Sequence, residues 1–309
     1  MSDDVAALLD RVPGWAGRAR ALDTLDGGIT NRNLLVDVDG DRFVLRLAGK
    51  DTELLGIDRA VERVAAERAA ELGLGPDVAA FLEPEQYLVT RFVVGDQIPV
   101  AEMGAEAVLA HTAPMLRAFH ESGPLPGAFD CFRIPEQSAT HARARGVVVP
   151  DAFDAVMDRA REIEAAFAAS PEPRVPCHND LLNANFLRDR TDIADRFWLL
   201  DWEYAGMNDR FFDLGNYAVN NELDDDGGDH LVEVYFGAVT ARRSARLALM
   251  RIMSDLREAM WGVVQQGIST LDFDYVAYAA EHFDRLLANA SRPGYRALLA
   301  EAATPEKVP

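Results

Sequence analysis

The first third of the chain alternates apolar and polar residues in short runs. This alternation predicts strands over residues 33–38 and 42–47. The intervening Asp39-Gly40-Asp41 predicts a tight turn, because glycine adopts a positive φ at no steric cost. Two more strands are expected over 78–82 and 87–94. The pattern therefore indicates a β-rich N-terminal part.

Beyond about residue 95 the apolar positions mostly repeat with a helical period. The exception is residues 171–221, where short strand-like runs lie beside many polar residues. These patterns predict an α+β fold with a small β-rich lobe, residues 1–95, and a larger, mainly α-helical lobe, residues 96–309. A ligand cleft is expected where the lobes meet. The predicted helices cover residues 5–9, 57–72, 101–121, 151–169, 229–239, 245–266 and 273–290.

Composition narrows the class of partner. The 309 residues include 31 Lys and Arg against 51 Asp and Glu, a net charge of -20. Such a charge repels phosphate backbones, so nucleic acid and anionic membranes are not expected partners, whereas cations are favoured. No apolar run is long enough for a membrane helix, and the acidic N-terminus does not resemble a secretion signal. Two cysteines without CxxC spacing are typical of a reducing compartment, so a cytoplasmic protein is expected.

The strongest chemical signal is the segment His-Asn-Asp-Leu-Leu-Asn-Ala-Asn at 178–185. Asp180 is followed five residues later by Asn185, and Asp201 comes at the end of an apolar strand-like run. Phosphoryl transfer needs these groups, because one carboxylate accepts the proton of the attacking hydroxyl while an amide and a second carboxylate hold Mg²⁺. Alternatively, Asp180 and Asn185 are loop residues that bond local backbone groups. A metal-dependent hydrolase is disfavoured, because no clustered histidine ligands accompany the carboxylates.

These motifs resemble the choline/ethanolamine kinase family, a branch of the aminoglycoside-phosphotransferase-like kinases. The resemblance rests on 177–185 and on Leu-Leu-Asp-Trp-Glu-Tyr at 199–204, which continue into Phe-Asp-Leu-Gly-Asn at 212–216. It extends to Gly-Gly-Ile-Thr-Asn at 27–31 and to Trp-Gly-Val-Val-Gln at 261–265, in the order found in the family. The resemblance implies a two-lobed, protein-kinase-like fold, and a homodimer is compatible with it.

By this resemblance Asp180 is the catalytic base, and Asn185 and Asp201 are the Mg²⁺ ligands. Arg46 contacts the phosphates of ATP, and Glu62 is the partner that orients it. An arginine keeps its charge at any pH and binds phosphate in a fork geometry. The alternative for Arg46 and Glu62 is an ordinary surface ion pair.

The remaining ATP-binding residues are also assigned by resemblance. The glycine-bearing loop contributes Gly28, Thr30 and Asn31, whose backbone and side chains can cradle phosphates. Phe92 lies in the segment expected to hold adenine. Taken alone, two glycines before a strand are more often a turn, and Phe92 also suits a strand end. Asp213 and His178 are expected to have structural roles, Asp213 by bonding backbone amides beneath the catalytic loop and His178 by tying that loop to the backbone.

The family's aromatic cage for a cationic substrate maps onto Tyr204, Trp261, Phe273 and Tyr278, although any one of them alone is more often a core residue. Asn220 stands where the family commonly has a glutamate, and Asp225 falls where an aromatic is expected. Glu258 replaces a tryptophan one helical turn before Trp261, and we expect it to supply the missing carboxylate, with Glu222 as another candidate.

The sequence therefore predicts an enzyme that uses ATP and Mg²⁺ to phosphorylate the hydroxyl of a small cationic amino alcohol such as choline or ethanolamine. The alternatives are an aminoglycoside kinase, a kinase of another small molecule such as thiamine, and a nucleotide-binding protein without catalysis. Loss of Asp180, Asn185 or Asp201 would favour the last, but all three residues are present.

Overall fold

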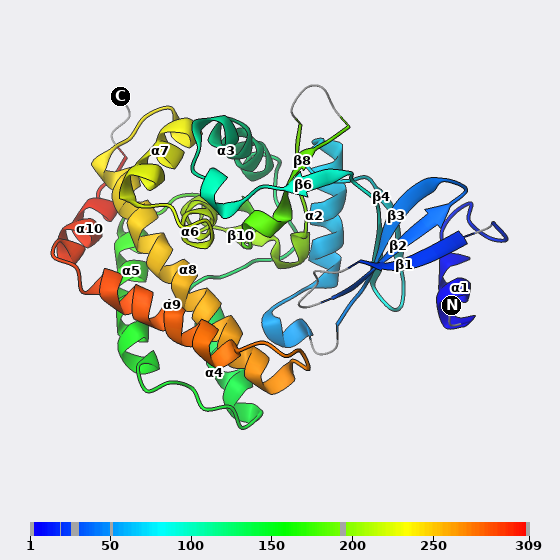
Figure 1. Ribbon diagram of the computed structural model, residues 1–309. Coiled ribbons are helices and arrows are strands. Elements are labelled where there is room, and N and C mark those ends of the chain that lie inside the picture. The colour runs from blue at the N-terminus through cyan, green and yellow to red at the C-terminus, as the bar shows by residue number, and fades with distance from the viewer. Residues whose placement is uncertain (1–2, 19, 26–30, 50–51, 192–195, 307–309) are drawn as a thin grey trace.

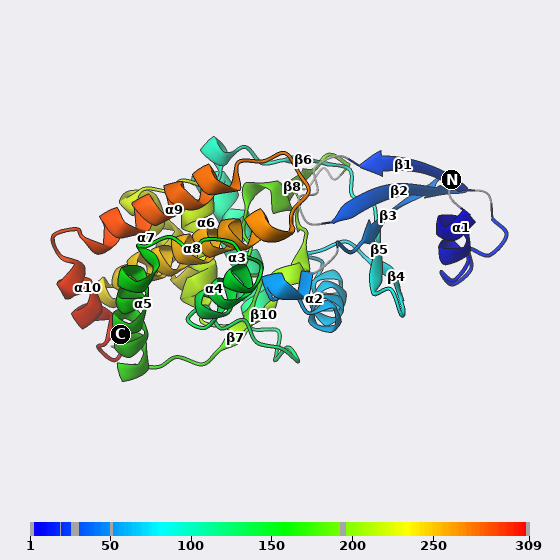
Figure 2. The same ribbon diagram turned by 90° about the horizontal axis from the view of Figure 1, so that it is seen from below.

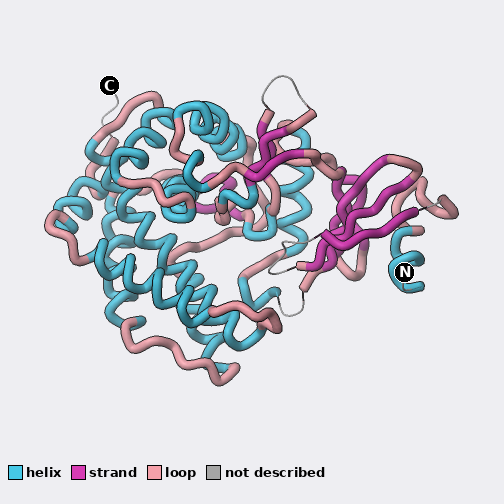
Figure 3. Tube along the Cα trace, in the orientation of Figure 1, coloured by secondary structure: helices cyan, strands magenta, loops and turns pink. Residues whose placement is uncertain are grey.

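The computed structural model describes residues 3–18, 20–25, 31–49, 52–191 and 196–306. A sheet-rich part lies at one end of the molecule and a helix-rich part at the other (Figures 1 and 3). This arrangement confirms the predicted α+β class. The sheet-rich part contains α1 (Asp3–Leu9), β1 (Arg20–Leu25), β2 (Arg32–Val38), β3 (Asp41–Leu47), η1 (Thr52–Leu55), α2 (Arg59–Glu71), β4 (Val78–Leu82) and β5 (Tyr87–Arg91).

Helices dominate the rest of the chain, and its described residues also form five short strands. The elements are β6 (Gly95–Gln97), η2 (Val100–Glu102), α3 (Glu106–His120), α4 (Ile134–Ala144), α5 (Phe153–Ala169), β7 (Val175–Cys177), η3 (Asn183–Asn185), β8 (Phe186–Asp189), β9 (Phe197–Leu199), η4 (Trp202–Tyr204), β10 (Gly206–Asn208), α6 (Arg210–Asn220), α7 (Asp225–Phe236), α8 (Ala241–Ile268), α9 (Tyr275–Ala290) and α10 (Tyr295–Ala302). None of the described helices is long and apolar enough to cross a bilayer.

The N-terminal sheet has the order β1-β2-β3-β5-β4, with antiparallel neighbours throughout. In the β2–β3 hairpin Val38 pairs with Asp41, and the two turn residues, Asp39 and Gly40, have φ angles of 54° and 92°. Positive φ at both central residues is the mark of the turn that suits the twist of a hairpin. Alternate residues of β2, including Val36, are buried in the core of this sheet.

Helix α2 connects the two parts of the molecule. The Asp58 carboxylate caps its first turn by accepting hydrogen bonds from the N–H groups of Ala60 and Val61. In Figures 1 and 2 the helix lies between the sheet and the larger helical part, and its apolar face shares one hydrophobic core with Phe119 and Trp202. The chain changes sheet beside the predicted boundary at residue 95, because β6 pairs with β8, but the core continues across that boundary through α2.

The sequence pattern does not predict β1, α4, α6 or α10. Helix α6 is only 11 residues long, and the polar residues Asp213 and Asn216 are buried in it beside the apolar ones. Strand β1 is an edge strand whose exposure does not alternate cleanly, and α4 and α10 are short. Helix α7 begins four residues before the predicted start, since the Asp224 side chain caps it by accepting from Gly227 N–H at 2.8 Å.

Helix α8, with 28 residues, is the central element of the helical part. Helices α4, α6, α9 and α10 all pack against it (Figure 1). The crossing of α6 over α8 is close at Gly215, where an added Cβ would lie 2.7 Å from the backbone carbon of Met250. Only glycine fits that crossing without backbone movement. Both cysteines are buried free thiols.

Candidate active site

The loop that follows β7, residues 178–185, is held by a buried carboxylate. Asp213 on α6 accepts hydrogen bonds from the backbone N–H groups of His178 (2.8 Å) and Asn179 (2.7 Å). His120 on α3 donates from Nε2 to the same carboxylate at 2.9 Å. Because Asp213 is fully buried, these bonds are needed to satisfy it, and they fix the backbone that presents Asp180. This is the structural role expected for Asp213.

Asn216, on the same helix, ties that loop to α8. Its Oδ1 accepts from the backbone N–H of Leu181 at 2.5 Å. Its Nδ2 donates to Ser254 Oγ at 3.1 Å and to Glu258 Oε1 at 3.2 Å. One fully buried side chain therefore contacts both the loop and the helix.

His178 has the structural position expected for it. Its ring is fully buried, with Nε2 donating to the Leu200 carbonyl at 2.8 Å and Nδ1 accepting from the Asp180 N–H at 3.2 Å. Burial lowers the pKa of His178 below its ordinary value. A neutral ring bonded on both sides braces the loop and has no nitrogen left for a substrate.

Asp180 is a buried carboxylate with an unusual charge environment. Burial raises its pKa to about 7, opposed by the Arg257 guanidinium and reinforced by Glu258, Asp201 and Glu203. Its Oδ1 lies 3.1 Å from Arg257 Nη1. A carboxylate with a pKa near neutrality is suited to accepting a proton at physiological pH.

Asn185 and Asp201 present oxygen atoms beside Asp180. Asn185 donates from Nδ2 to the Asp180 carbonyl at 2.8 Å, which leaves its Oδ1 for another partner. Asp201 follows β9 and has φ 64° and ψ 67°, a left-handed backbone that is costly for a non-glycine residue and typical of functional sites. An amide oxygen and a carboxylate are the hard ligands that Mg²⁺ prefers. These residues therefore fit the metal that the sequence predicts.

The expected ion pair between Arg46 and Glu62 is present. Arg46 Nη1 lies 3.0 Å from Glu62 Oε1 and 2.6 Å from Asp201 Oδ1. The pair places a guanidinium from β3 against the carboxylate that follows β9. The Arg46 guanidinium thus links the sheet-rich part to Asp201 in the helix-rich part.

A second arginine, which sequence reasoning missed, extends this network. Arg59 Nη1 contacts Glu62 Oε2 at 2.7 Å and Glu203 Oε2 at 3.0 Å. Asn31 donates to Glu203 Oε2 at 2.7 Å, and Arg59 Nη2 donates to Asn31 Oδ1 at 3.0 Å. Burial and the neighbouring Asp201 raise the pKa of Glu203 to about 7. Glu203 lies in the Asp-Trp-Glu segment at 201–203, and this position beside Asp201 was the sequence feature that could have indicated its place in the site.

Two adjoining cavities meet at Asn185 and Asp201, which line both. The first, of about 280 Å³, lies between the N-terminal sheet and the segment around β8, and Arg46 and Phe92 line it. Of the other predicted ATP residues, Glu62 lines neither cavity and reaches the first only through Arg46.

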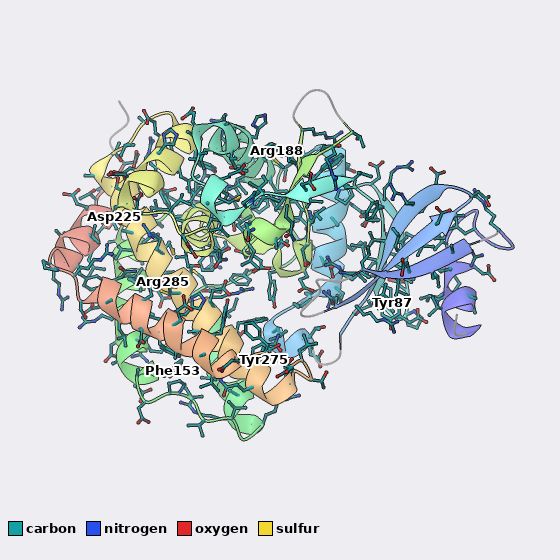
Figure 4. All side chains as sticks on the ribbon, in the orientation of Figure 1. Tyr87, Phe153, Arg188, Asp225, Tyr275 and Arg285 are labelled. Atoms are coloured by element: carbon teal, nitrogen blue, oxygen red, sulfur yellow. The ribbon has the colours of Figure 1, made fainter. Side chains whose placement is uncertain are left out.

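The second cavity, of about 220 Å³, contains Asp180 and most of the predicted substrate residues. Trp261 and Tyr278 stand edge to face with ring centres 5.6 Å apart, and Phe273 lies 5.9 Å from Tyr278. Tyr275, labelled in Figure 4, packs behind Trp261 at 5.8 Å. The lining residues that matter for chemistry are Asn31, Asp180, Asn185, Asp201, Glu203, Tyr204, Arg257, Glu258, Trp261, Phe273 and Tyr278.

Among the described residues, Asn220 and Asp225 line neither cavity. Asn220 lies at the end of α6 outside both, and its Nδ2 is buried with no hydrogen-bond partner among the described residues. Gly28 and Thr30 lie outside the described residues. Asp225, labelled in Figure 4, starts α7 and pairs with Arg251.

Comparisons with known proteins give a consistent family. The family model described as choline/ethanolamine kinase matches residues 22–226. A choline/ethanolamine kinase family protein of known structure from Mesorhizobium loti is 31% identical, with a TM-score of 0.80, and the overlap covers 97% of this chain and 98% of that one. This likeness confirms the predicted two-lobed, protein-kinase-like fold.

More distant relatives are similar over less of their length. Protein LicA of Haemophilus influenzae is 27% identical over 218 residues, which span 68% of this chain but only 61% of LicA. Ethanolamine kinase 2 of Homo sapiens is 25% identical over 302 residues, covering 88% of this chain and 77% of that protein.

Proposed function

We propose a reaction for this chain, which belongs to the choline/ethanolamine kinase family and is a small-molecule kinase. In this proposal the enzyme uses Mg²⁺ and transfers the γ-phosphoryl group of ATP to the hydroxyl of a small amine-bearing alcohol. The observation that carries the proposal is the junction of the two cavities. Asn185 and Asp201 line both cavities, Arg46 lines the first and Asp180 lines the second. A phosphoryl group passing from one cavity to the other would cross this junction.

In the proposed reaction Asp180 accepts the proton of the substrate hydroxyl. The substrate oxygen forms a new bond to the γ-phosphorus, and the bond between that phosphorus and the leaving oxygen of ADP breaks in line. The raised pKa of Asp180, about 7, suits a general base at physiological pH. Asp213 and His178 hold the loop, so the carboxylate is already oriented when the substrate binds.

ATP is proposed to occupy the first cavity. Arg46 would contact its phosphates while Glu62 holds the guanidinium in place. Asn185 and Asp201 would hold Mg²⁺, which when bound neutralises charge on the phosphates. Phe92 lies on the wall of the cavity, where an aromatic side chain can stack on adenine.

The acceptor is proposed to occupy the second cavity. Its outer wall is formed by the aromatic side chains of Trp261, Phe273 and Tyr278, which favour a cationic group. Similarity to human ethanolamine kinase 2 supports an amino alcohol as the substrate class. At about 220 Å³ the cavity is matched to a small molecule.

An acceptor screen tests this proposal. ADP release with ATP and Mg²⁺ would be measured against choline, ethanolamine, their methylated intermediates, thiamine and aminoglycosides, with thermal shifts recorded in parallel. We expect acceptor-dependent ADP release with at least one amine-bearing alcohol, and release at least ~100-fold slower from the Asp180→Asn variant. ATP binding without turnover of any such alcohol, or turnover of aminoglycosides alone, would contradict it.

A further inference from the structure

Arg257 is a buried cation in the wall of the second cavity that the sequence analysis did not single out. It lies on α8 and is only 4% exposed. Its Nη1 contacts Asp180 Oδ1 at 3.1 Å and Glu258 Oε1 at 2.7 Å, and its guanidinium carbon stands 4.2 Å from the centre of the Tyr204 ring. Its Nη2 has no hydrogen-bond partner among the described residues.

This arrangement changes what the cavity offers to a substrate cation. The Arg257 guanidinium covers one face of the Tyr204 ring, so a substrate cation cannot bind over that face. Glu258 is also fully engaged, since Oε1 accepts from Arg257 and Asn216 and Oε2 accepts from Tyr278 at 2.9 Å. Burial alone would raise the pKa of Glu258, but Arg257, His282 and the hydrogen bonds from Tyr278 and Arg257 together outweigh burial, and the pKa lies below its ordinary value. Glu258 therefore lines the cavity as a partner of Arg257.

The position of Arg257 relative to the reacting hydroxyl is the decisive point. A hydroxyl that gives its proton to Asp180 must lie within ~3 Å of that carboxylate. Arg257 is bonded to the same carboxylate. In ethanolamine and choline the nitrogen is separated from the hydroxyl oxygen by only two carbons, so their positive charge would lie close to the guanidinium.

We propose that the acceptor carries a carboxylate as well as an amine, and that Arg257 is the specificity-determining residue that binds this carboxylate. The proposal rests on the function proposed above and narrows its substrate class to hydroxylated zwitterions. The amine is still needed, because four carboxylates line the cavity against one guanidinium among its described residues: Asp180, Asp201, Glu203 and Glu258 against Arg257. The outer wall of Trp261, Phe273 and Tyr278 remains for the ammonium group.

A matched pair of substrates tests this directly, because serine is ethanolamine with a carboxylate added to the carbon that carries the amine. ADP release would be compared for ethanolamine, choline, L-serine and its longer homologue L-homoserine under identical ATP and Mg²⁺. We expect kcat/KM for at least one of the two amino acids to exceed that for ethanolamine by at least ~10-fold, the effect of one added charged hydrogen bond. Faster turnover of ethanolamine or choline would overturn the inference and leave the proposed function intact. No turnover of any of the four, with ATP bound, would count against both.

Variants of Arg257 give a second readout that does not depend on stability. Arg257→Met should raise KM for the amino acid by ~10–100-fold relative to its effect on KM for ethanolamine, because a charged hydrogen-bond donor is lost for only one of them. Arg257→Lys should recover part of that difference. Arg251→Met, which removes an arginine of α8 outside the cavity, is the matched control and should leave the KM ratio unchanged. Equal KM changes for both substrates in Arg257→Met would refute the role.

Discussion

Replacing Asp180 with asparagine should lower turnover and stabilise the fold at the same time. The side chain keeps its shape but can no longer accept the hydroxyl proton, so kcat should fall by ~10²–10⁴-fold, or ~3–5 kcal/mol of barrier. Burial, opposed by Arg257 and reinforced by Glu258, raises the pKa of Asp180 from 3.8 to about 7. At pH 8 the ionised carboxylate thus destabilises the folded protein by ~4 kcal/mol, at 1.36 kcal/mol for each pH unit.

The sign of this effect gives it a pH signature. Between pH 3.8 and about 7 the folded protein holds a proton at Asp180 that the unfolded chain has released, so this group's contribution to stability is lost as pH rises. Asparagine removes that loss. The Tm advantage of the asparagine variant should be absent near pH 4 and reach ~8 °C at pH 8, at roughly 2 °C per kcal/mol for a chain of this size.

Thermal unfolding from pH 4 to 8.5, together with kcat from ADP release, measures both effects. Asp158→Asn, the same change at an exposed position, is the control and should show neither. A lower Tm than the parent at pH 8, a Tm difference that does not vary with pH, or turnover near the parent rate would refute the reasoning.

Three further substitutions separate the roles of the two cavities. Asp201→Asn should raise the Mg²⁺ concentration needed for half-maximal rate by ~10-fold or more, because a carboxylate ligand is lost, and an unchanged Mg²⁺ titration would contradict its role. Arg46→Lys keeps the charge but loses the fork geometry, so KM for ATP should rise by ~10-fold, whereas a parent-like KM would place Arg46 outside the nucleotide site. Phe273→Ala should raise KM for the amine-bearing acceptor by ~2–30-fold and leave KM for ATP unchanged; the reverse pattern would move the acceptor to the first cavity.

The site could be predicted from sequence where its residues lie in one segment or at strand ends. Asp180 and Asn185 share a loop, and Asp201 follows a short apolar strand, so spacing alone indicated that they would meet. The pair of Arg46 and Glu62 was expected from the family resemblance, and the structure contains it. The β2–β3 hairpin was equally accessible, because its turn residues are next to each other.

Arg257 could not be found in the same way. Its partners are Asp180, 77 residues earlier in the chain, and the ring of Tyr204, and only tertiary packing brings these groups together. An arginine inside a helix otherwise predicts a solvated face. Asn220 is the opposite case, a residue that was predicted but does not lie at the site. Its position in the family pattern suggested a contact with the substrate, but its side chain lines neither cavity.

The double attachment of Asn216 limits how this enzyme can evolve. The side chain that steadies Leu181 also bonds Glu258, and Gly215 next to it keeps the two helices at their closest spacing. A mutation that reshapes the acceptor pocket through α8 will therefore also disturb the loop carrying Asp180. Changes of substrate preference that preserve rate are expected to accumulate just before α9, at Phe273, whose ring takes no part in the hydrogen bonds that join Asn216 and Glu258 to the loop of Asp180.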